Sequence, residues 1–332
     1  MKLPVDAEIR PDELEAGLRW IHAAASPSER ALVLADARER LAQCEPARKS
    51  AQTPLAACWR GERMAGSYFK LLSGNVATLG GARAAPGWEQ VATDLIISQI
   101  ELLSSLGVPQ IQAIVRADDL ATNDLVRRAG MTLLTKIDHL WLDVLATYSL
   151  AGNASGEAAS VRGAGKLTGT SPAQTAMRWR PAHDLAQADL AQFIDATFAD
   201  TLDCPALNGH RTPVEVLDGF LEGRELDDSS LHWELLEVDA STVGCLLLQV
   251  HENQLMELMY MGLIPAARGR SLGKAMVARA IDTAHRWECS TLVVAVDRDN
   301  WPALDAYLAW GFQPHQRLQV WLAQNNDQRG ST

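Results

Sequence analysis

The sequence lacks the marks of a membrane, secreted or metal-binding protein. It has no run of about 20 apolar residues that could cross a bilayer, and residues 1–8 contain no apolar signal-peptide region. The five cysteines are scattered and odd in number, and the eight histidines form no HxxxH or Cys/His pair with metal-ligand spacing. We therefore expect a soluble cytoplasmic protein with reduced thiols and no bound metal.

The chain also lacks an excess of basic residues, since it has 30 Lys and Arg against 41 Asp and Glu, with a net charge of -11. Nucleic acids and anionic membranes both reward a basic surface. We therefore expect neither as the main partner, whereas basic or neutral amines are compatible with such an acidic protein.

The length and composition indicate two domains. At 332 residues and 47% hydrophobic content, the chain is too long for one small core. Residues 151–176 are rich in Gly, Ala, Ser and Thr, which is typical of a linker. We expect one domain over residues 1–150 and a second over residues 177–325.

Hydrophobic periodicity and turn residues predict the same order of elements in both domains. In the first domain we expect helices at 12–25, 28–44, 88–106 and before Gly130, and strands at 55–60, 64–72, 76–81, 111–116 and 139–144. In the second domain we expect helices at 185–199 and 213–222, from residue 272 onward and from Asn300 to Gly311, and strands at 177–180, 232–238, 243–249, 257–264 and 291–296. The strand at 139–144 is expected to close the first domain.

An internal repeat accounts for this common order. A shift of 181 residues, which is the spacing between Gly130 and Gly311, aligns the end of the first domain with the end of the second. The same shift places residues 111–115 on residues 292–296 without a gap. A repeat at domain scale indicates two copies of one fold, and the copies need not share their chemistry.

A turn rich in Arg and Gly lies between the strand at 257–264 and the helix that follows it. A proline ends the strand, and Arg268, Gly269, Arg270 and Gly273 come after it. The free N–H groups of a helix start attract phosphate, glycine permits close approach, and arginine adds charge-assisted donors. The turn therefore predicts an anion site, and a solvated turn without a ligand is the alternative.

The rest of the segment carries a family resemblance. The apolar run at 291–296 is typical of a strand buried on both faces. The Pro-x-x-Arg-Gly-x-x-x-Gly start, and the Asn-x-x-Ala-x-x-x-Tyr-x-x-x-Gly-Phe ending from Asn300 to Phe312, resemble the GNAT superfamily of acyl-CoA-dependent N-acyltransferases. Ser271 departs from the usual Gln/Arg-x-x-Gly-x-Gly/Ala loop, where the family has its first glycine, so we expect weakened rather than lost cofactor binding.

The resemblance implies an α/β (α+β) fold of two tandem GNAT-like domains, each with a mixed, mostly antiparallel twisted sheet flanked by helices. It implies an acetyl-CoA-dependent N-acetyltransferase, an acyltransferase for groups other than aminoacyl groups, with its active site in the second domain. Acetyl-CoA is the implied cosubstrate, and Gly262 is expected to leave room for it against the strand. The implied cofactor-binding residues are Met261, Gly262, Leu263, Arg268, Gly269, Arg270, Ser271, Leu272, Gly273, Lys274 and Asn300.

Direct attack of a primary amine on a thioester requires a base for the ammonium and an acid for the leaving thiolate. The resemblance places Tyr307 beside the sulfur as the acid, and an aromatic packed in the core is the alternative. Glu257 is the implied base, on a mostly apolar strand face that alternation would give to Glu257, Met259, Met261 and Leu263. A solvated edge glutamate, or a chain of waters in place of a single base, is the alternative.

The resemblance places the acceptor pocket between the helices at 185–199 and 213–222. The polar residues of that segment are Asp203, Asn208, His210 and Arg211. They could bind a polar acceptor, either a small-molecule amine or a peptide N-terminus, and His210 could relay protons near neutral pH. A helix–helix loop with Pro and Gly turn chemistry is the alternative.

The first copy has lost these motifs. At the shifted positions Arg268, Arg270, Gly273, Asn300 and Tyr307 become Gly87, Glu89, Ala92, Asp119 and Val126. Glu89 would repel a diphosphate, so we expect this copy to wall the active site, with a second acyl-CoA site as the alternative. Tandem proteins with one working half resemble the mycothiol synthase group of GNAT proteins. A noncatalytic acyl-CoA binder or scaffold is the alternative to an enzyme, and the sequence predicts no oligomeric state.

Overall fold

A computed structural model gives the fold and describes residues 11–27, 30–31, 33–36, 55–59, 62–147 and 177–323. The expected linker at 151–176 and most of the expected helix at 28–44 lie outside the described residues. Among the helices in the described ranges, none combines the length and the apolar character that a membrane crossing requires.

The chain divides into two compact units that do not follow the sequence order. Unit 1 contains the residues up to Thr135 together with those from Leu318 onward, and unit 2 runs from Lys136 to Arg317. Each unit therefore contains chain from both sides of the expected linker.

Unit 2 is built on a mixed, mostly antiparallel sheet with the strand order β5-β10-β9-β8-β7-β6. Strands β9 and β10 run parallel, and the other neighbouring pairs run antiparallel. The strands are β5 (Thr132–Asp143), β6 (Met177–Pro181), β7 (Leu231–Val238), β8 (Ser241–His251), β9 (Leu255–Leu263) and β10 (Thr291–Asp297).

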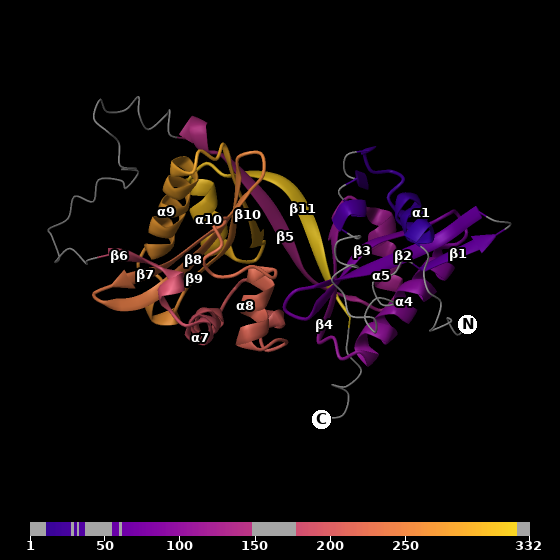
Figure 1. The fold of residues 1–332 in the computed structure, drawn as a ribbon, viewed down its shortest axis with the longest axis horizontal. Helices are drawn as coiled ribbons and strands as arrows, with labels where there is room; N and C mark the ends of the chain where they lie inside the picture. The colour runs from indigo at the N-terminus through magenta and orange to yellow at the C-terminus, as the bar shows by residue number, and fades with distance from the viewer. Residues whose placement is uncertain are drawn as a thin grey trace. The chain divides into compact units, whose positions relative to one another are not determined.

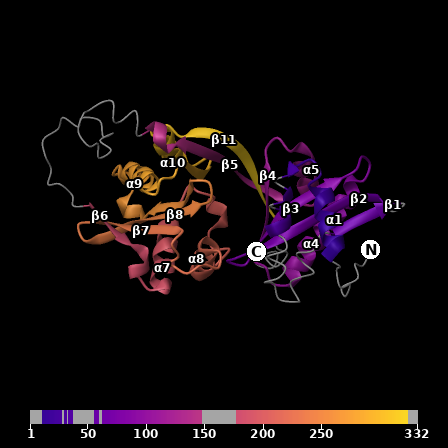
Figure 2. The same ribbon diagram turned by 45° about the horizontal axis from the view of Figure 1, so that its top comes forward.

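Helices cover both faces of this sheet, as both ribbon views show (Figures 1 and 2). On one face lie α7 (Gln187–Phe198) and α8 (Pro213–Leu221), and on the other lie α9 (Leu272–Arg286) and α10 (Trp301–Ala309). Short 3-10 turns precede α7, α8 and α9, namely η1 (Ala182–Asp184), η2 (Pro205–Leu207) and η3 (Pro265–Ala267).

Each helical layer closes an apolar core on its own face of the sheet. The four-residue spacing that predicts the buried face of α9 is confirmed, since Leu272, Met276, Ala280 and Ala284 are all buried. On the opposite face, the side chains of α7 and α8 pack against Cys245 and neighbouring residues of β7 and β8. Strand β8 therefore packs on both sides, which accounts for its continuous apolar run.

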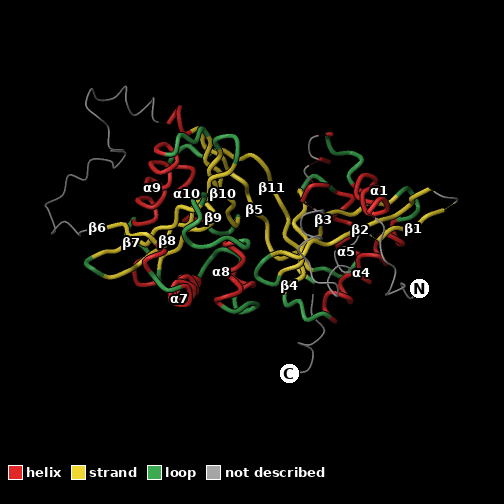
Figure 3. Tube along the Cα trace, in the orientation of Figure 1, coloured by secondary structure: helices red, strands yellow, loops and turns green. Residues whose placement is uncertain are grey.

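Unit 1 repeats this plan with the strand order β1-β2-β3-β4-β11, and Figure 3 shows its strands in yellow and its helices in red. Its strands are β1 (Leu55–Trp59), β2 (Glu62–Leu72), β3 (Val76–Ala84), β4 (Gln110–Arg116) and the part of β11 (Gln313–Leu322) from Leu318 onward. Its helices are α1 (Pro11–Ile21), α4 (Glu89–Ser105) and α5 (Leu120–Arg128). Strands β3 and β4 run parallel, as β9 and β10 do in unit 2.

The last strand of each copy is exchanged. Strand β5 pairs antiparallel with β10 along residues 137–143, and β11 pairs antiparallel with β4 along residues 318–322. The expectation that the strand at 139–144 closes the first copy is therefore wrong, and the sequence did not predict β11 at all. Periodicity predicts that a segment is a strand but does not predict its partner, and two copies of one fold offer equivalent edges.

Side chains anchor both exchanged strands. In unit 2, the Arg317 Nε atom donates to Asp138 Oδ1 of β5 at 3.1 Å. In unit 1, the Trp321 Nε1 atom of β11 donates to the buried Asn123 Oδ1 atom of α5 at 2.9 Å. These bonds satisfy polar groups that burial would otherwise leave without partners.

The internal repeat and the fold class are confirmed. Strand β4 and helix α5 have the same bounds as β10 and α10 after the shift of 181 residues. Each copy has a mixed, mostly antiparallel sheet flanked by helices. The ranges 1–150 and 177–325 stay an expectation for the inherited domains, and the compact units differ from them by the exchanged strands.

Candidate functional site

Strand β9 carries a β-bulge that changes which face its side chains meet. The register between β8 and β9 shifts at Met259, which has no residue opposite it. Met261 and Leu263 therefore pack against the core under α9, whereas Met259 packs toward α7 and α8. The expectation that Glu257, Met259, Met261 and Leu263 share one face is wrong, because simple alternation holds only for a regular strand.

Beyond the bulge, β9 and β10 separate. Their parallel pairing ends where Leu258 lies opposite Val294, although β9 continues to Leu263. From Met259 to Leu263, no described strand pairs with β9 on the β10 side. Main-chain groups are thereby open to an extended ligand, as at the edge of a sheet. Ligand contact through Met261, Gly262 and Leu263 stays a prediction.

Gly262 lies under the end of α7. A Cβ atom at this position would lie 2.5 Å from Thr197 Oγ1 and 2.5 Å from the Tyr260 hydroxyl oxygen. Those two oxygens are 2.7 Å apart, and Thr197 also donates to the Ile194 carbonyl at 2.6 Å. Helix α7 therefore fills the space above Gly262 that was expected for the ligand, and close packing requires the glycine.

The Arg268 guanidinium is engaged by backbone carbonyl groups. Its Nε atom donates to Leu263 O at 3.1 Å, Nη1 to Asp200 O at 2.8 Å, and Nη2 to Thr197 O at 2.9 Å. The carbonyls at a helix C-terminus lack intrahelical partners and favour a cation. Arg268 thus ties the end of α7 to the end of β9. Its contact with phosphate stays a prediction, and these bonds compete with that contact.

The turn before α9 leaves the N-terminus of the helix open. Gly269 and Ser271 have φ angles of 73° and 61°, and the Ser271 side chain makes no capping hydrogen bond. A Cβ atom at Gly269 or Gly273 would meet no atom within 4 Å beyond its own local chain. The side chains of Arg270 and Lys274 are exposed. Free space, helix N–H groups and two cations together suit an anion.

The equivalent turn of unit 1 is closed by a carboxylate. Glu89 stands where Arg270 stands after the shift, and its Oε1 atom accepts the Gly87 N–H at 3.1 Å. Hydrogen bonds from the backbone of Glu89 and of Gly87 lower the pKa of this carboxyl. The negative charge therefore occupies the helix N-terminus of α4, where a phosphate would otherwise lie.

Tyr307 lies buried on α10, with its ring centroid 5.4 Å from that of Phe312. Burial, and then the negative charge of Asp203, raise the pKa of its phenol, so the group stays protonated. Asn300 is the N-cap residue of α10, but its side chain makes no capping hydrogen bond. In unit 1 the shifted residue Asp119 does cap its helix. The catalytic role of Tyr307 and the cofactor contact of Asn300 stay predictions.

Two acidic residues join the loop after α7 to the end of β10. The Asp297 N–H donates to Asp203 Oδ1 at 3.0 Å, and the Cys204 N–H donates to Asp297 Oδ2 at 2.9 Å. Burial, and then the charge of Asp297, raise the pKa of Asp203 even though it accepts a backbone hydrogen bond. The loop is thus fixed at the place where β9 and β10 separate.

The same residues bring potential metal ligands within 4.8 Å of one another, namely Asp203, Cys204 and Asp297. Both oxygens of Asp297 already accept backbone N–H groups, from Cys204 and from Asp299. Burial and the two carboxylates raise the pKa of the Cys204 thiol, which disfavours the thiolate that a metal or an acyl-enzyme would require. This cluster therefore suits a structural or proton-transfer role better, and the absence of a metal stays a prediction.

A cavity of 470 Å³ lies on the α7 and α8 side of β9. Its polar wall includes three of the residues expected to bind the acceptor, namely Asp203, Asn208 and Arg211, but not His210. Its apolar wall includes Leu207, Val216, Phe220 and Met259. The volume and the mixed wall are typical of a site for a small molecule.

Arg211 is the cation of this cavity. Burial lowers the pKa of its guanidinium, although the nearby charge of Glu215 opposes this shift. Among the described residues Arg211 donates no hydrogen bond. A partly buried guanidinium without a hydrogen-bond acceptor favours an anionic group on a ligand. Acceptor binding by Asp203, Asn208, His210 and Arg211 stays a prediction.

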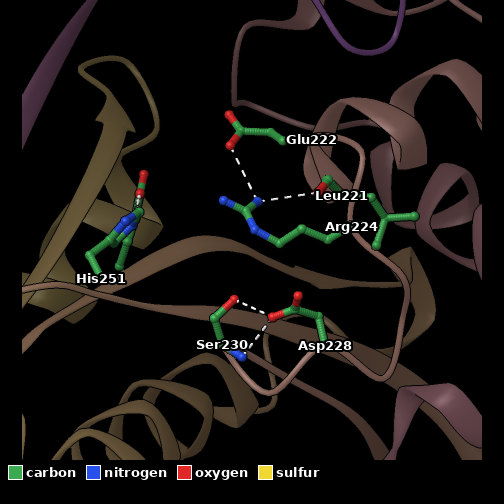
Figure 4. A network of polar contacts seen from close by, with 7 residues as sticks. Leu221, Glu222, Arg224, Asp228, Ser230 and His251 are labelled. Carbon is green, nitrogen blue, oxygen red and sulfur yellow. Dashed lines mark hydrogen bonds and ion pairs between the residues drawn. The ribbon is translucent and has the colours of Figure 1, made fainter. Parts of the chain in front are cut away.

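Glu257 lies on β9 before the bulge, and it is less buried than an apolar face would make it. Its Oε2 atom lies 2.8 Å from His251 Nε2, and the two side chains are 42% and 35% exposed respectively. Figure 4 shows His251 in one view with the polar contacts of the loop that follows α8, where Arg224 donates to the Leu221 carbonyl. Glu257 as the base stays a prediction.

Sequence reasoning did not find several residues of this site. Asp297 is the last residue of β10 and directly follows an apolar run, so an acid in that place was a usable signal. Thr197 and Tyr260 contact each other from α7 and β9, and no local pattern predicts that pairing. His251 lies near Glu257 through a turn between β8 and β9, which a hairpin register could have predicted.

The comparisons agree with this geometry. Residues 195–312 match the sequence model of the Acetyltransferase (GNAT) family, from α7 through α10. This stretch of the chain is therefore similar to the GNAT acetyltransferases, which are acyltransferases.

Particular relatives are more distant. The chain is 29% identical over 94 residues to a mycothiol acetyltransferase of Renibacterium salmoninarum, which is 28% of this chain and 26% of that protein. It is 31% identical over 106 residues to a mycothiol acetyltransferase of Streptomyces griseus, which is 30% of this chain and 34% of that protein. The match thus spans about a quarter to a third of the length of these relatives.

Solved structures share the fold over most of the chain. A GCN5-related N-acetyltransferase from Sphaerobacter thermophilus has a TM-score of 0.54 at 15% identity and covers 82% of this chain and 80% of its own. A tandem GNAT protein from the clavulanic acid biosynthesis pathway has a TM-score of 0.52 at 13% identity and covers 98% and 97%. At these identities the likeness shows the fold alone, and that fold is a tandem GNAT arrangement.

Proposed function

We propose that unit 2 is an acetyl-CoA-dependent N-acetyltransferase that transfers the acetyl group to a primary amine by direct attack. The open helix N-terminus of α9, beside the separating strands β9 and β10, carries this proposal. The diphosphate of CoA would lie on the N–H groups of α9, held by Arg270 and Lys274. The pantetheine would extend along Met261 to Leu263.

The contrast between the two copies supports a single cofactor site. Glu89 occupies the helix N-terminus of α4 with its own carboxylate, whereas α9 has Arg270 at the shifted position. A carboxylate and a diphosphate cannot share the same N–H groups. We therefore expect one acetyl-CoA per chain, bound in unit 2.

The buried phenol of Tyr307 would protonate the CoA thiolate as it leaves. Its protonated state, its burial and its electrostatic coupling to Asp203 support an acid at this place. The acceptor would enter the cavity of 470 Å³ between α7, α8 and β9. A small-molecule amine fits that volume, and a peptide N-terminus could enter it with its first residue.

A noncatalytic acyl-CoA binder is the second candidate. Ser271 takes a left-handed backbone conformation that costs a residue with a side chain about 1 kcal/mol, and the Arg268 donors are engaged elsewhere. Both observations favour weaker cofactor binding. Turnover distinguishes this candidate from an enzyme.

Calorimetric titration with acetyl-CoA tests the proposal. We expect one site per chain with a Kd in the micromolar range. Arg270→Glu should abolish this binding, whereas Glu89→Gln, the matched change in unit 1, should leave affinity and stoichiometry unchanged. Two sites in the wild type, or loss of binding only in the Glu89 variant, would contradict the placement in unit 2.

Turnover is then measured as release of the CoA thiol with a panel of the twenty amino acids, their amides and short peptides. An amine that accelerates thiol release and gains an acetyl group supports the enzyme. Binding of acetyl-CoA without turnover by any amine would favour the noncatalytic binder.

A further inference from the structure

Asp203 lies where the acceptor cavity meets the elements that would hold the thioester. It lines the cavity between α7, α8 and β9, and it is hydrogen-bonded to the end of β10. Its charge raises the pKa of the phenols of Tyr260 on β9 and Tyr307 on α10. No other carboxylate of the described chain combines these positions.

The hydrogen bonds of Asp203 hold one carboxylate oxygen and leave the other free. Oδ1 accepts the Asp297 N–H at 3.0 Å, while the Asp203 N–H donates to Thr201 Oγ1 at 3.0 Å. Within the described part of the chain, Oδ2 accepts no hydrogen bond. A fixed carboxylate with one free oxygen on a cavity wall can accept a proton from a bound ligand.

The surroundings of Asp203 make its carboxylate a stronger base than a carboxylate in water. Burial and the neighbouring charge of Asp297 raise its pKa, which brings the carboxylate closer to the range of a useful base. The other ionisable groups facing it are Cys204, Tyr260 and Tyr307, all of which are neutral at pH 7 because burial raises their pKa. The remaining charged groups of the cavity wall are Asp195 and Arg211.

We propose that Asp203 is the general base that deprotonates the acceptor ammonium in the cavity of unit 2. This inference rests on the proposed function. The ammonium gives one proton to Asp203 Oδ2 and becomes a neutral amine, whose lone pair forms the C–N bond to the thioester carbonyl carbon. The C–S bond breaks, and the thiolate takes the phenol proton of Tyr307. The surplus proton of the new amide nitrogen restores the phenol, and Asp203 returns its proton to water.

Asp297 and Cys204 act on this step as positioning residues. Asp297 holds Oδ1 through its backbone N–H and raises the basicity of Asp203 through its charge. The Cys204 N–H holds Asp297 in turn. The pair Asp203 and Asp297 joins segments 94 residues apart, so the base is set by tertiary structure and not by a local motif.

Glu257 is the competing base, and its geometry serves the role less well. Its carboxylate is hydrogen-bonded to His251 and is 42% exposed. Water and the imidazole therefore compete with a bound amine for the carboxylate oxygens. It does not line the cavity that contains Asp203 and Arg211. Replacing each carboxylate in turn therefore shows which of the two controls the fall of activity at low pH.

The test measures kcat/KM against pH with acetyl-CoA and the best amine of the panel. The wild type should lose activity as the pH falls through the raised pKa of Asp203, because the base becomes protonated. Asp203→Asn, which keeps an oxygen for the Asp297 N–H, should lower kcat/KM at pH 7 by about 100- to 10,000-fold and lose this acid limb. Asp189→Asn, the same change at an exposed position of α7 outside the cavity, should leave the profile unchanged.

Two further readouts separate a base from a structural residue. Hydroxylamine is neutral at pH 7 and needs no prior deprotonation, so the deficit of Asp203→Asn should shrink at least about tenfold with this acceptor. Asp297→Asn keeps Asp203 but removes the like charge beside it, so the acid limb should move to lower pH. Asp297→Asn keeps the inference testable if Asp203→Asn fails to fold.

The outcomes distinguish the inference from the proposed function. If acetyl-CoA binds and the wild type turns over, but Asp203→Asn stays within about threefold of it, Asp203 is not the base. Loss of the acid limb in Glu257→Gln alone would assign the base to Glu257. A wild type that neither binds acetyl-CoA nor turns over would overturn the proposed function, and the inference with it.

Discussion

Replacing Gly262 by Ala should destabilise unit 2, because α7 leaves no room for a methyl group. The added Cβ atom would lie 2.5 Å from Thr197 Oγ1 and from the Tyr260 hydroxyl. Overpacking of this kind costs about 1–3 kcal/mol, and separating the two hydroxyls, which are 2.7 Å apart, adds about 1 kcal/mol. The sum of about 2–4 kcal/mol corresponds to a fall of roughly 4–16 °C in the Tm of this unit.

Differential scanning calorimetry without ligand provides the measurement, with the transition of unit 2 followed separately because a protein of two units need not unfold in one step. Gly273→Ala is the matched control. It lies in the same unit, at ordinary φ and with no atom within 4 Å of its Cβ position, so the change should be neutral or stabilise α9 by up to about 1 kcal/mol.

A double-mutant cycle with Thr197→Ala isolates the contact. That variant removes the Oγ1 atom but keeps the Thr197 Cβ atom, which would lie 2.8 Å from the new methyl group. The cost of Gly262→Ala should therefore fall by about 0.5–3 kcal/mol in the Thr197→Ala background, without vanishing. An unchanged Tm in Gly262→Ala, or strictly additive costs, would show that packing against α7 is not the reason for the glycine.

Further predictions concern three other side chains of the site. Tyr307→Phe should lower kcat by about 100- to 10,000-fold while the calorimetric Kd for acetyl-CoA stays the same, and an unchanged kcat would exclude the phenol as the acid. Arg211→Gln should raise KM for amino acids by about 10- to 100-fold but leave KM for their amides unchanged, since only the former offer a carboxylate to the guanidinium. Asp203→Asn should raise the Tm at pH 7, because a raised folded pKa means that ionising Asp203 costs stability as the pH rises through that value. This gain should shrink as the pH falls toward the ordinary value of 3.8, and a constant gain would contradict it.

The sequence predicted elements whose signals are local. Strand β10 is a continuous apolar run, and α10 begins after Asn300 and ends before Gly311, so each boundary had its own residue signal. The turn before α9 was predicted for the same reason. The repeat predicts the same elements twice, since the two copies carry the same pattern at a constant spacing.

The sequence did not predict features that depend on long-range contacts. The bulge at Met259 depends on the register with β8, and it reversed the face of the residues that follow. Arg268 was expected to bind phosphate, but the carbonyl groups that it contacts lie as far as 71 residues away along the chain. Strand exchange involves a choice between two equivalent edges, and the hydrophobic periodicity of either strand does not predict that choice.

The exchange of β5 and β11 has a consequence for biosynthesis and for evolution. Strand β4 is translated well before its partner, residues 318–322, because the whole of unit 2 lies between them in the sequence. The sheet of unit 1 cannot be completed before residues 318–322 have been translated, and a truncated first half would expose the edge of β4 to other chains. Neither copy can therefore be deleted without leaving the other incomplete. The copy whose turn before α4 is closed by Glu89 can therefore be retained because it supplies a strand to the other copy.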